Sequence, residues 1–154
     1  MGRHKVSRSI VIGAPAERIF DIIATPSRHS EVDGSGTVQN AVSGPERLES
    51  GSEFDMDMRM FGIPYRMTNR VVEFEPDRLI AWRHIGPHRW RYELEELAEG
   101  RTRVTETFDY SIGFSPFSAF SAYYVLAGLP ARNAAGIEQS LLRLKDVAEK
   151  SEAA

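Results

Sequence analysis

The chain predicts an α+β fold, in which an antiparallel sheet of about seven strands packs against a long C-terminal helix, with two short helices after strand one. Turn signals recur roughly every 10 to 13 residues through the middle of the chain, which is typical of consecutive antiparallel strands. The segments between these turns alternate apolar and charged residues, so one sheet face is expected to be packed and the other solvated. Residues 130–149 show apolar residues at helical spacing instead.

The N-terminal region predicts one strand and two short helical segments. Residues 5–12, KVSRSIVI, are rich in β-branched side chains and form the strand, which Gly13 ends. Pro15 then opens a helix in APAERIFDIIA, because proline is favoured in a first helical turn and the apolar residues recur on one face. Pro26 ends this helix, and the segment that follows predicts one more helical turn before GSG at 34–36.

A row of methionines marks the next part of the chain, after a weak strand in TVQNAV and a loop in GPERLESG. Residues 52–61 alternate, with Phe54 and three methionines on one face and charged residues on the other; the methionines are Met56, Met58 and Met60. Methionine is flexible and polarizable, so the row is either ordinary core or one wall of a pocket for a variable apolar guest. In both cases we expect the C-terminal helix to cover it.

Four further strands are expected, separated by turns at Pro76-Asp77, Gly86-Pro87 and Glu99-Gly100. Their sequences are YRMTNRVVEF from residue 65, LIAWRHI from residue 79, WRYELEEL from residue 90 and RVTETFDYSI from residue 103.

The C-terminal region predicts a connector and a helix. Residues 113–129 repeat aromatic side chains every three positions and predict a short helical connector; alternatively, 114–124 form a protein-interaction surface. The helix over 130–149 places four apolar residues on one face, and residues 150–154 are expected to fray. The four apolar residues are Ile137, Leu141, Leu144 and Ala148.

Composition narrows the class of protein. The net charge of −3 argues against nucleic acid or an anionic membrane as the main partner, and no apolar run approaches the roughly 20 residues of a membrane span. The absence of cysteine excludes disulfides, a thiolate nucleophile and a cysteine-ligated metal, and the four histidines lack metal-binding spacing. We expect one cytoplasmic domain over 1–154, with a core of about 3–149, no cofactor, and a monomeric or homodimeric state that the sequence leaves open.

With this order of elements the sequence resembles the START-like superfamily, also called SRPBCC, and within it the polyketide cyclase/dehydrase and lipid-transport group. The similarity covers nearly the whole chain. It rests on APAERIFDIIA, the loop from Gly44 to Gly51, VVEFEPDRLIAWR, and RWRYELEEL followed by GRTRVTETFDY. The resemblance implies a helix-grip fold, in which a curved sheet wraps the C-terminal helix, and a deep cavity between them for apolar or aromatic small molecules.

We therefore expect the chain to bind or transport a lipid-like or polyketide-like molecule. The expected lining is mostly aromatic, with the methionines and two residues of the C-terminal helix. These residues are Phe54, Met56, Met58, Met60, Tyr65, Met67, Trp82, Trp90, Tyr92, Phe108, Tyr110, Phe117, Phe120, Ile137 and Leu141.

Three polar side chains are in phase with the apolar residues of their strands: Asn69, His84 and Glu106. A glutamate in an apolar cavity has a raised pKa, and a neighbouring histidine could share its proton. Such a pair could act as base and acid in an aldol cyclisation or a dehydration, so a cyclase/aromatase-type enzyme is the alternative function. The competing structural interpretations place His84 at the sheet rim, pair Glu106 with an arginine, and put Asn69 at a bulged strand edge.

Overall fold

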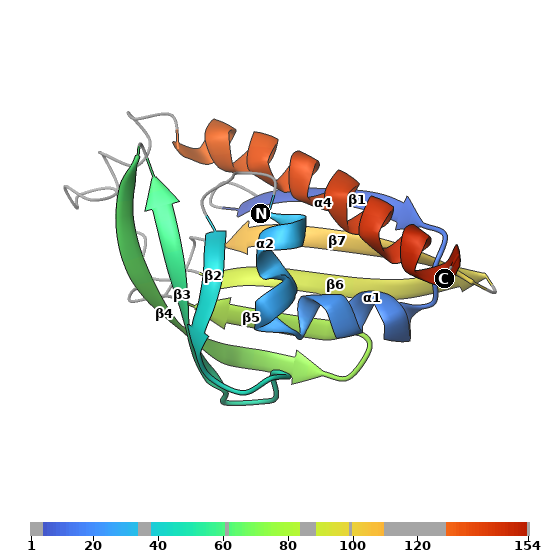
Figure 1. Cartoon of the computed structure of the whole chain (residues 1–154). Coiled ribbons are helices and arrows are strands. Elements are labelled where there is room, and N and C mark those ends of the chain that lie inside the picture. Colours follow the sequence, from blue (N-terminus) through green and yellow to red (C-terminus); the bar gives the residue numbers. More distant parts are fainter. Residues whose placement is uncertain are drawn as a thin grey trace.

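A seven-stranded antiparallel sheet forms one layer of the protein, and helices on one of its faces form the other (Figure 1). The computed structural model describes residues 5–33, 38–60, 62–83, 89–98, 100–109 and 129–153. The strands are β1 (Lys5–Ile12), β2 (Val38–Ser43), β3 (Glu53–Met60), β4 (Ile63–Glu75), β5 (Leu79–Arg83), β6 (Arg89–Ala98) and β7 (Arg101–Asp109). The helical elements are α1 (Ala16–Ile23), the 3-10 turn η1 (Pro26–Arg28), α2 (His29–Val32) and α4 (Leu129–Ala153).

The sheet has the order β1-β7-β6-β5-β4-β3-β2. Strands β2 to β7 therefore form a continuous meander, and β1 pairs antiparallel with β7 at the edge. β3 and β4 run steeply to β5, β6 and β7, so the sheet is strongly curved (Figure 1). The α+β helix-grip architecture predicted from the sequence is confirmed. α4 continues to Ala153, beyond Glu149, where the sequence placed its end, and residues 113–128 of the expected connector lie outside the described residues.

Register brings the apolar residues of neighbouring strands side by side on the inner face, which is the face toward the helices. Ile80 lies opposite Tyr92, and Leu94 lies opposite Val104. Side chains opposite each other in an antiparallel pair point to the same side of the sheet. All four of these side chains are buried under the helices. The helices contribute matching buried faces, including Ile137, Leu141, Leu144 and Ala148 of α4, as their helical spacing predicted.

The helices divide the inner face between them, which corrects one expectation. α4 packs mainly on β1, with further contacts to β7, α1 and α2, and does not lie chiefly over the methionine row of β3. Five strand spacings separate β1 from β3, roughly 24 Å, whereas a helix is only about 10–12 Å wide. The inner face of β3 is approached by α2, whose His29 ring lies 5.6 Å from the Phe54 ring.

The loop between β2 and β3 requires glycine at one end for a steric reason. Gly44 has a φ of +120°, and a Cβ placed there would lie 2.7 Å from the Cβ of Phe54. Between Gly44 and Gly51 the loop inserts Leu48 into the core, where its backbone N–H donates to the carbonyl oxygen of Ala24. The glycine-flanked loop therefore ties the short helices to β3.

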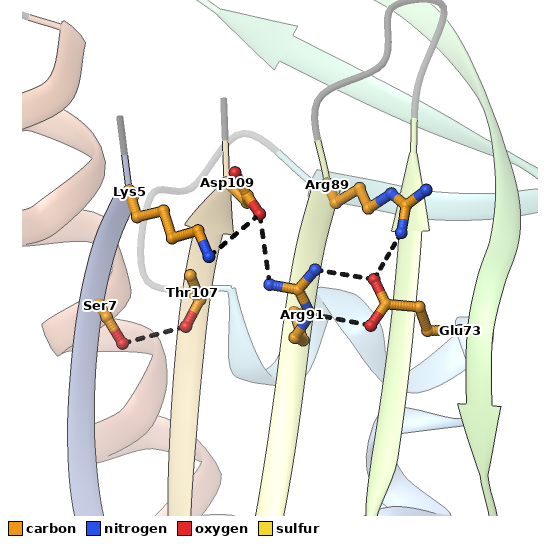
Figure 2. A network of polar contacts seen from close by, with 7 residues as sticks. All are labelled: Lys5, Ser7, Glu73, Arg89, Arg91, Thr107 and Asp109. Carbon is orange, nitrogen blue, oxygen red and sulfur yellow. Dashed lines mark hydrogen bonds and ion pairs between the residues drawn. The ribbon is translucent and has the colours of Figure 1, made fainter. Parts of the chain in front are cut away.

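Charged side chains on the outer face of the sheet form a network across four strands (Figure 2). Arg91 of β6 donates two hydrogen bonds to Glu73 of β4, at 3.0 and 2.7 Å, and its Nη1 lies 3.5 Å from Asp109 of β7. Lys5 of β1 lies 3.7 Å from the same Asp109 carboxylate. Strand β5 lies between β4 and β6, and its residue at this level is the fully buried Ala81, whose small side chain lets Arg91 reach Glu73.

We predict that Ala81→Leu lowers the free energy of unfolding by about 1–3 kcal/mol, because the larger side chain overpacks the site and separates Arg91 from Glu73. Urea denaturation measures this change. Ala41→Leu, the same substitution at an exposed position of β2, is the control and should change stability by less than about 0.5 kcal/mol. Equal stability of the two variants would contradict the spacer role of Ala81.

Candidate functional site

The inner face holds a buried carboxyl group, that of Glu106 on β7. Glu106 lies directly opposite Tyr92 of β6 and is 4 % exposed. The side chains of Tyr92 and Glu106 are hydrogen bonded to each other. Oε1 of Glu106 is also buried, and it has no hydrogen-bond partner within the described part of the chain. An unsatisfied buried polar atom is uncommon in folded proteins and invites a functional explanation.

Burial decides the ionisation of this pair. Desolvation raises the pKa of Glu106 to about 8, which outweighs the opposite effect of the hydrogen bond from Tyr92; the negative charge of Asp33 raises it further. Desolvation, followed by the charge of Glu106, also raises the pKa of the Tyr92 hydroxyl well above its usual value. Asp33 acts in the same direction on the pKa of Tyr65, after burial. At neutral pH the Glu106 carboxyl is therefore mostly protonated and is a hydrogen-bond donor.

Aromatic rings surround the pair on one side. The Tyr92 ring lies 5.8 Å from the Trp82 ring, which stacks on His29 at 5.1 Å and meets Phe54 edge-on at 5.7 Å. Burial lowers the pKa of His29 to about 4, so the imidazole is neutral at pH 7. Its Nε2 lies 2.7 Å from the carbonyl oxygen of Ile23, and since a carbonyl only accepts, Nε2 carries the proton. His29 is thus a neutral ring in an aromatic wall.

The side chain of Asn69 hydrogen bonds to the backbone of its own and the neighbouring strand. Its side chain is buried, and its Nδ2 donates to the carbonyl oxygens of Met67 at 3.3 Å and Phe54 at 3.5 Å. These contacts hold the side-chain amide between β3 and β4. A role of Asn69 toward a ligand stays a prediction.

The other predicted lining residues differ in their burial. Buried members of the set are Phe54, Met56, Trp82, Tyr92, Phe108, Ile137 and Leu141, whereas Met58, Tyr65, Met67 and Trp90 are half-buried. Trp90 contacts Phe108 with a ring separation of 4.5 Å. Tyr110, Phe117, Phe120, His84 and the side chain of Met60 lie outside the described residues, so the proposed pairing of His84 with Glu106 stays a prediction.

Sequence reasoning found the inward phase of Glu106 but missed His29, which stacks on Trp82, and Asp33, whose charge acts on Glu106. His29 and Asp33 belong to α2 and the residue after it, where the only sequence signal was a short helical turn. No sequence pattern relates these two residues to a strand that lies roughly 70 residues later, so only the tertiary structure brings them together. Tyr92 was expected as a lining residue, but its hydrogen bond with Glu106 depends on strand register, which the sequence did not specify.

Two kinds of site were not found in the described ranges. Among these residues no group of three or more histidine, aspartate or glutamate side chains is arranged to hold a metal ion. Nor does any helix among them have the length and apolar character to cross a membrane.

Comparison with known proteins places this arrangement in a family. The model of the family described as polyketide cyclase / dehydrase and lipid transport matches residues 3–149. The chain belongs to this family. An uncharacterised protein of Mycobacterium tuberculosis, Rv0088, is 46% identical over 145 residues, which are 94% of this chain and 64% of that protein. The chain thus spans less than two thirds of the length of the curated relatives it matches.

Solved structures agree in fold at low sequence identity. Protein NE0264 from Nitrosomonas europaea is 14% identical, with a TM-score of 0.70 over 100% of this chain and 99% of its own. The Zhui aromatase/cyclase from a Streptomyces species is 15% identical, with a TM-score of 0.63 over 92% of this chain and 93% of its own. At this identity the likeness shows the shared helix-grip fold.

We predict that stability falls by about 2 kcal/mol between about pH 6.5 and pH 8, because Glu106 binds its proton more tightly in the folded chain than in the unfolded one. The sign follows from the raised pKa: this contribution is complete below pH 4.5, the ordinary value, and is lost as the pH rises through about 8. His29 acts oppositely, since its lowered pKa destabilises the folded chain only as the pH falls from 6.5 toward 4.

Urea denaturation at a series of pH values measures this slope. Glu106→Gln should flatten it, because glutamine does not titrate. Glu93→Gln, an exposed position on the outer face of β6, is the matched control and should leave the slope unchanged. A slope in Glu106→Gln equal to that of the unsubstituted protein would assign the pH dependence to other groups.

Proposed function

We propose that the protein binds a hydrophobic or aromatic small molecule against the inner face of the sheet, where the neutral carboxyl of Glu106 orients the molecule. One observation carries the proposal: Oε1 of Glu106 is buried and has no hydrogen-bond partner among the described residues. Leaving such a group unsatisfied costs about 1–3 kcal/mol, which a ligand carbonyl or hydroxyl could recover. Membership of a family described as polyketide cyclase / dehydrase and lipid transport supports the same class of ligand.

The chemistry of the surroundings favours an apolar ligand with a single polar anchor. Uncharged ring surfaces are supplied by Trp82, Phe54 and neutral His29. Tyr92 is hydrogen bonded to the Glu106 carboxyl group. Small-molecule sites commonly combine mostly apolar walls with a few polar groups that set orientation. Because Glu106 is protonated at neutral pH, it can donate a hydrogen bond to an acceptor on the ligand, such as a carbonyl or hydroxyl oxygen.

Half-buried apolar residues indicate where the ligand would enter. Met58, Tyr65 and Met67 belong to the β3–β4 hairpin, and Trp90 lies near the start of β6. Their inward-facing neighbours deeper along the strands, such as Met56 and Tyr92, are buried. Methionine side chains can repack around ligands of different shape, which suits a binding site at this end of the inner face.

We predict that Glu106→Leu weakens binding of ligands that carry a carbonyl or hydroxyl by about tenfold or more, the equivalent of one lost buried hydrogen bond. Fluorescence of Trp82 and Trp90 during titration with fatty acids and aromatic polyketides measures the affinity. Native mass spectrometry of gently purified protein identifies a co-purified ligand. Glu93→Leu is the matched control on the outer face and should bind like the unsubstituted protein.

Absence of any bound mass and of any fluorescence response across the panel would contradict the binding function. Binding that is unaffected by Glu106→Leu would leave a ligand site but remove Glu106 from it. The circular dichroism spectrum of each variant checks that the fold is retained.

Acid–base catalysis is a second candidate, favoured by the pKa of Glu106 near 8. A carboxylic acid with a pKa close to ambient pH can protonate a leaving hydroxyl during dehydration, and the resulting carboxylate can accept a proton from a carbon acid. The aromatase/cyclase named Zhui shares the fold, which supports this candidate by analogy only. The reaction proposed is dehydration or aldol cyclisation of a polyketide-like chain.

For this candidate, Glu106→Gln should lower turnover of a poly-β-ketone substrate by about 100-fold or more while ligand affinity changes by less than about tenfold. Glutamine keeps the size and an acceptor for Tyr92 but has no proton to transfer. Product analysis by liquid chromatography measures the rate, with Glu93→Gln as control. Full turnover in Glu106→Gln would exclude the catalytic role and leave binding intact.

A further inference from the structure

Three arginines stand in one row across the outer face of the sheet. Arg70 of β4 lies directly opposite Arg83 of β5, which lies directly opposite Arg89 of β6. Residues paired in this way project on the same face, here the face opposite the helices, because the neighbouring Asn69, Trp82 and Trp90 belong to the inner face. Like charges directly opposite each other destabilise a sheet, so this row needs a compensating partner.

The protein itself compensates only the ends of the row: Glu53 of β3 lies opposite Arg70 and Asp109 of β7 lies opposite Arg89, whereas both strand neighbours of Arg83 are arginines. Arg89 donates from Nη1 to Glu73 at 2.7 Å, but its Nε is buried and has no hydrogen-bond partner in the described segments. Arg70 and Arg83 are exposed, and no ion pair joins either of them to another described residue. Within the described ranges, the exposed guanidinium groups of Arg70 and Arg83 are therefore available to a ligand.

The three arginines line a surface depression of about 520 Å³. Its other walls are Ser50 and Gly51 of the loop before β3 and Val71 and Val72 of β4. This volume is within the range of roughly 300–1,000 Å³ that is typical of small-molecule sites. The depression lies on the opposite side of the sheet from Glu106, so a ligand there does not compete for the inner face.

We propose that this depression binds the phosphate monoester group of a small molecule. A phosphate dianion matches the charge of the two unpaired arginines, and guanidinium groups bind phosphate oxygens through paired, charge-assisted hydrogen bonds. Arg89 closes the row of arginines, with its Nη1 held by Glu73. Ser50 can add a hydroxyl at the rim. The site is independent of the function proposed for the inner face.

Isothermal titration calorimetry with glycerol 3-phosphate tests the site, with glycerol as the neutral comparison. We expect saturable binding of glycerol 3-phosphate that weakens with added salt, and no binding of glycerol. The double variant Arg70→Gln/Arg83→Gln should lower the affinity at least tenfold. The control Arg66→Gln/Arg103→Gln removes two exposed arginines that already pair with Asp57 and Glu95, and should change it less than twofold.

Folding is a separate readout for the same variants. Without ligand, Arg70→Gln/Arg83→Gln should be at least as stable as the unsubstituted protein, because it removes repulsion along the row. A thermal melt checks this, so a loss of binding cannot be assigned to misfolding.

Flotation with phosphatidylcholine vesicles, with or without phosphatidic acid, distinguishes the source of the phosphate group. Binding to glycerol 3-phosphate in solution assigns a soluble phosphate monoester, and binding only to vesicles with phosphatidic acid assigns a lipid headgroup. Absence of binding in both arms would overturn the proposal. Equal affinity of the row variant and the control variant would overturn it as well.

Discussion

The strands of the sheet alternate apolar and charged side chains, so one face has to be covered by helices while the other carries its charges in water or in pairs. Helices from both ends of the chain cover the apolar face. α4 packs over β1 and β7, whereas α1, η1 and α2 pack against the middle and far strands. Charged residues of the outer face pair across strands, and the small Ala81 lets Arg91 reach Glu73. The inner layer is otherwise apolar, which gives its few polar groups unusual properties.

Glu106 illustrates these properties. In water its carboxyl would ionise near pH 4.5, but under the helices desolvation outweighs the hydrogen bond from Tyr92 and the neutral acid dominates at pH 7. Desolvation keeps His29 neutral by the same physics, with the opposite direction of pKa shift. A core without ligands gains nothing from an acid whose Oε1 has no partner among the residues that the structure describes, and an apolar side chain there would avoid the desolvation cost. Stability alone disfavours such a residue, and the proposed ligand would supply the missing partner.

Much of the fold was predictable from the sequence because strand alternation and turn chemistry are local. The burial of Ile137 and Leu141 followed from helical spacing, and the inward phase of Glu106 followed from the period of two along β7. Which helix covers which strands was not predictable, since this depends on the separation of β1 from β3 across the sheet. Nor could the contacts of His29 with Trp82 and Phe54 be foreseen, because they join a helical turn to strands far along the chain.

Direct titration of the Glu106 carboxyl group tests whether it is buried and neutral at pH 7. In protein labelled with carbon-13 at the glutamate side-chain carboxyls, the Glu106 resonance is assigned by its loss in Glu106→Gln and followed against pH by nuclear magnetic resonance. A buried, neutral carboxyl group should titrate with a midpoint near pH 8 in the free protein, with a further rise when a ligand accepts a hydrogen bond from the neutral acid. A midpoint near 4.5, the ordinary value, would show a solvated or ion-paired carboxylate and would rule out a neutral Glu106 at pH 7.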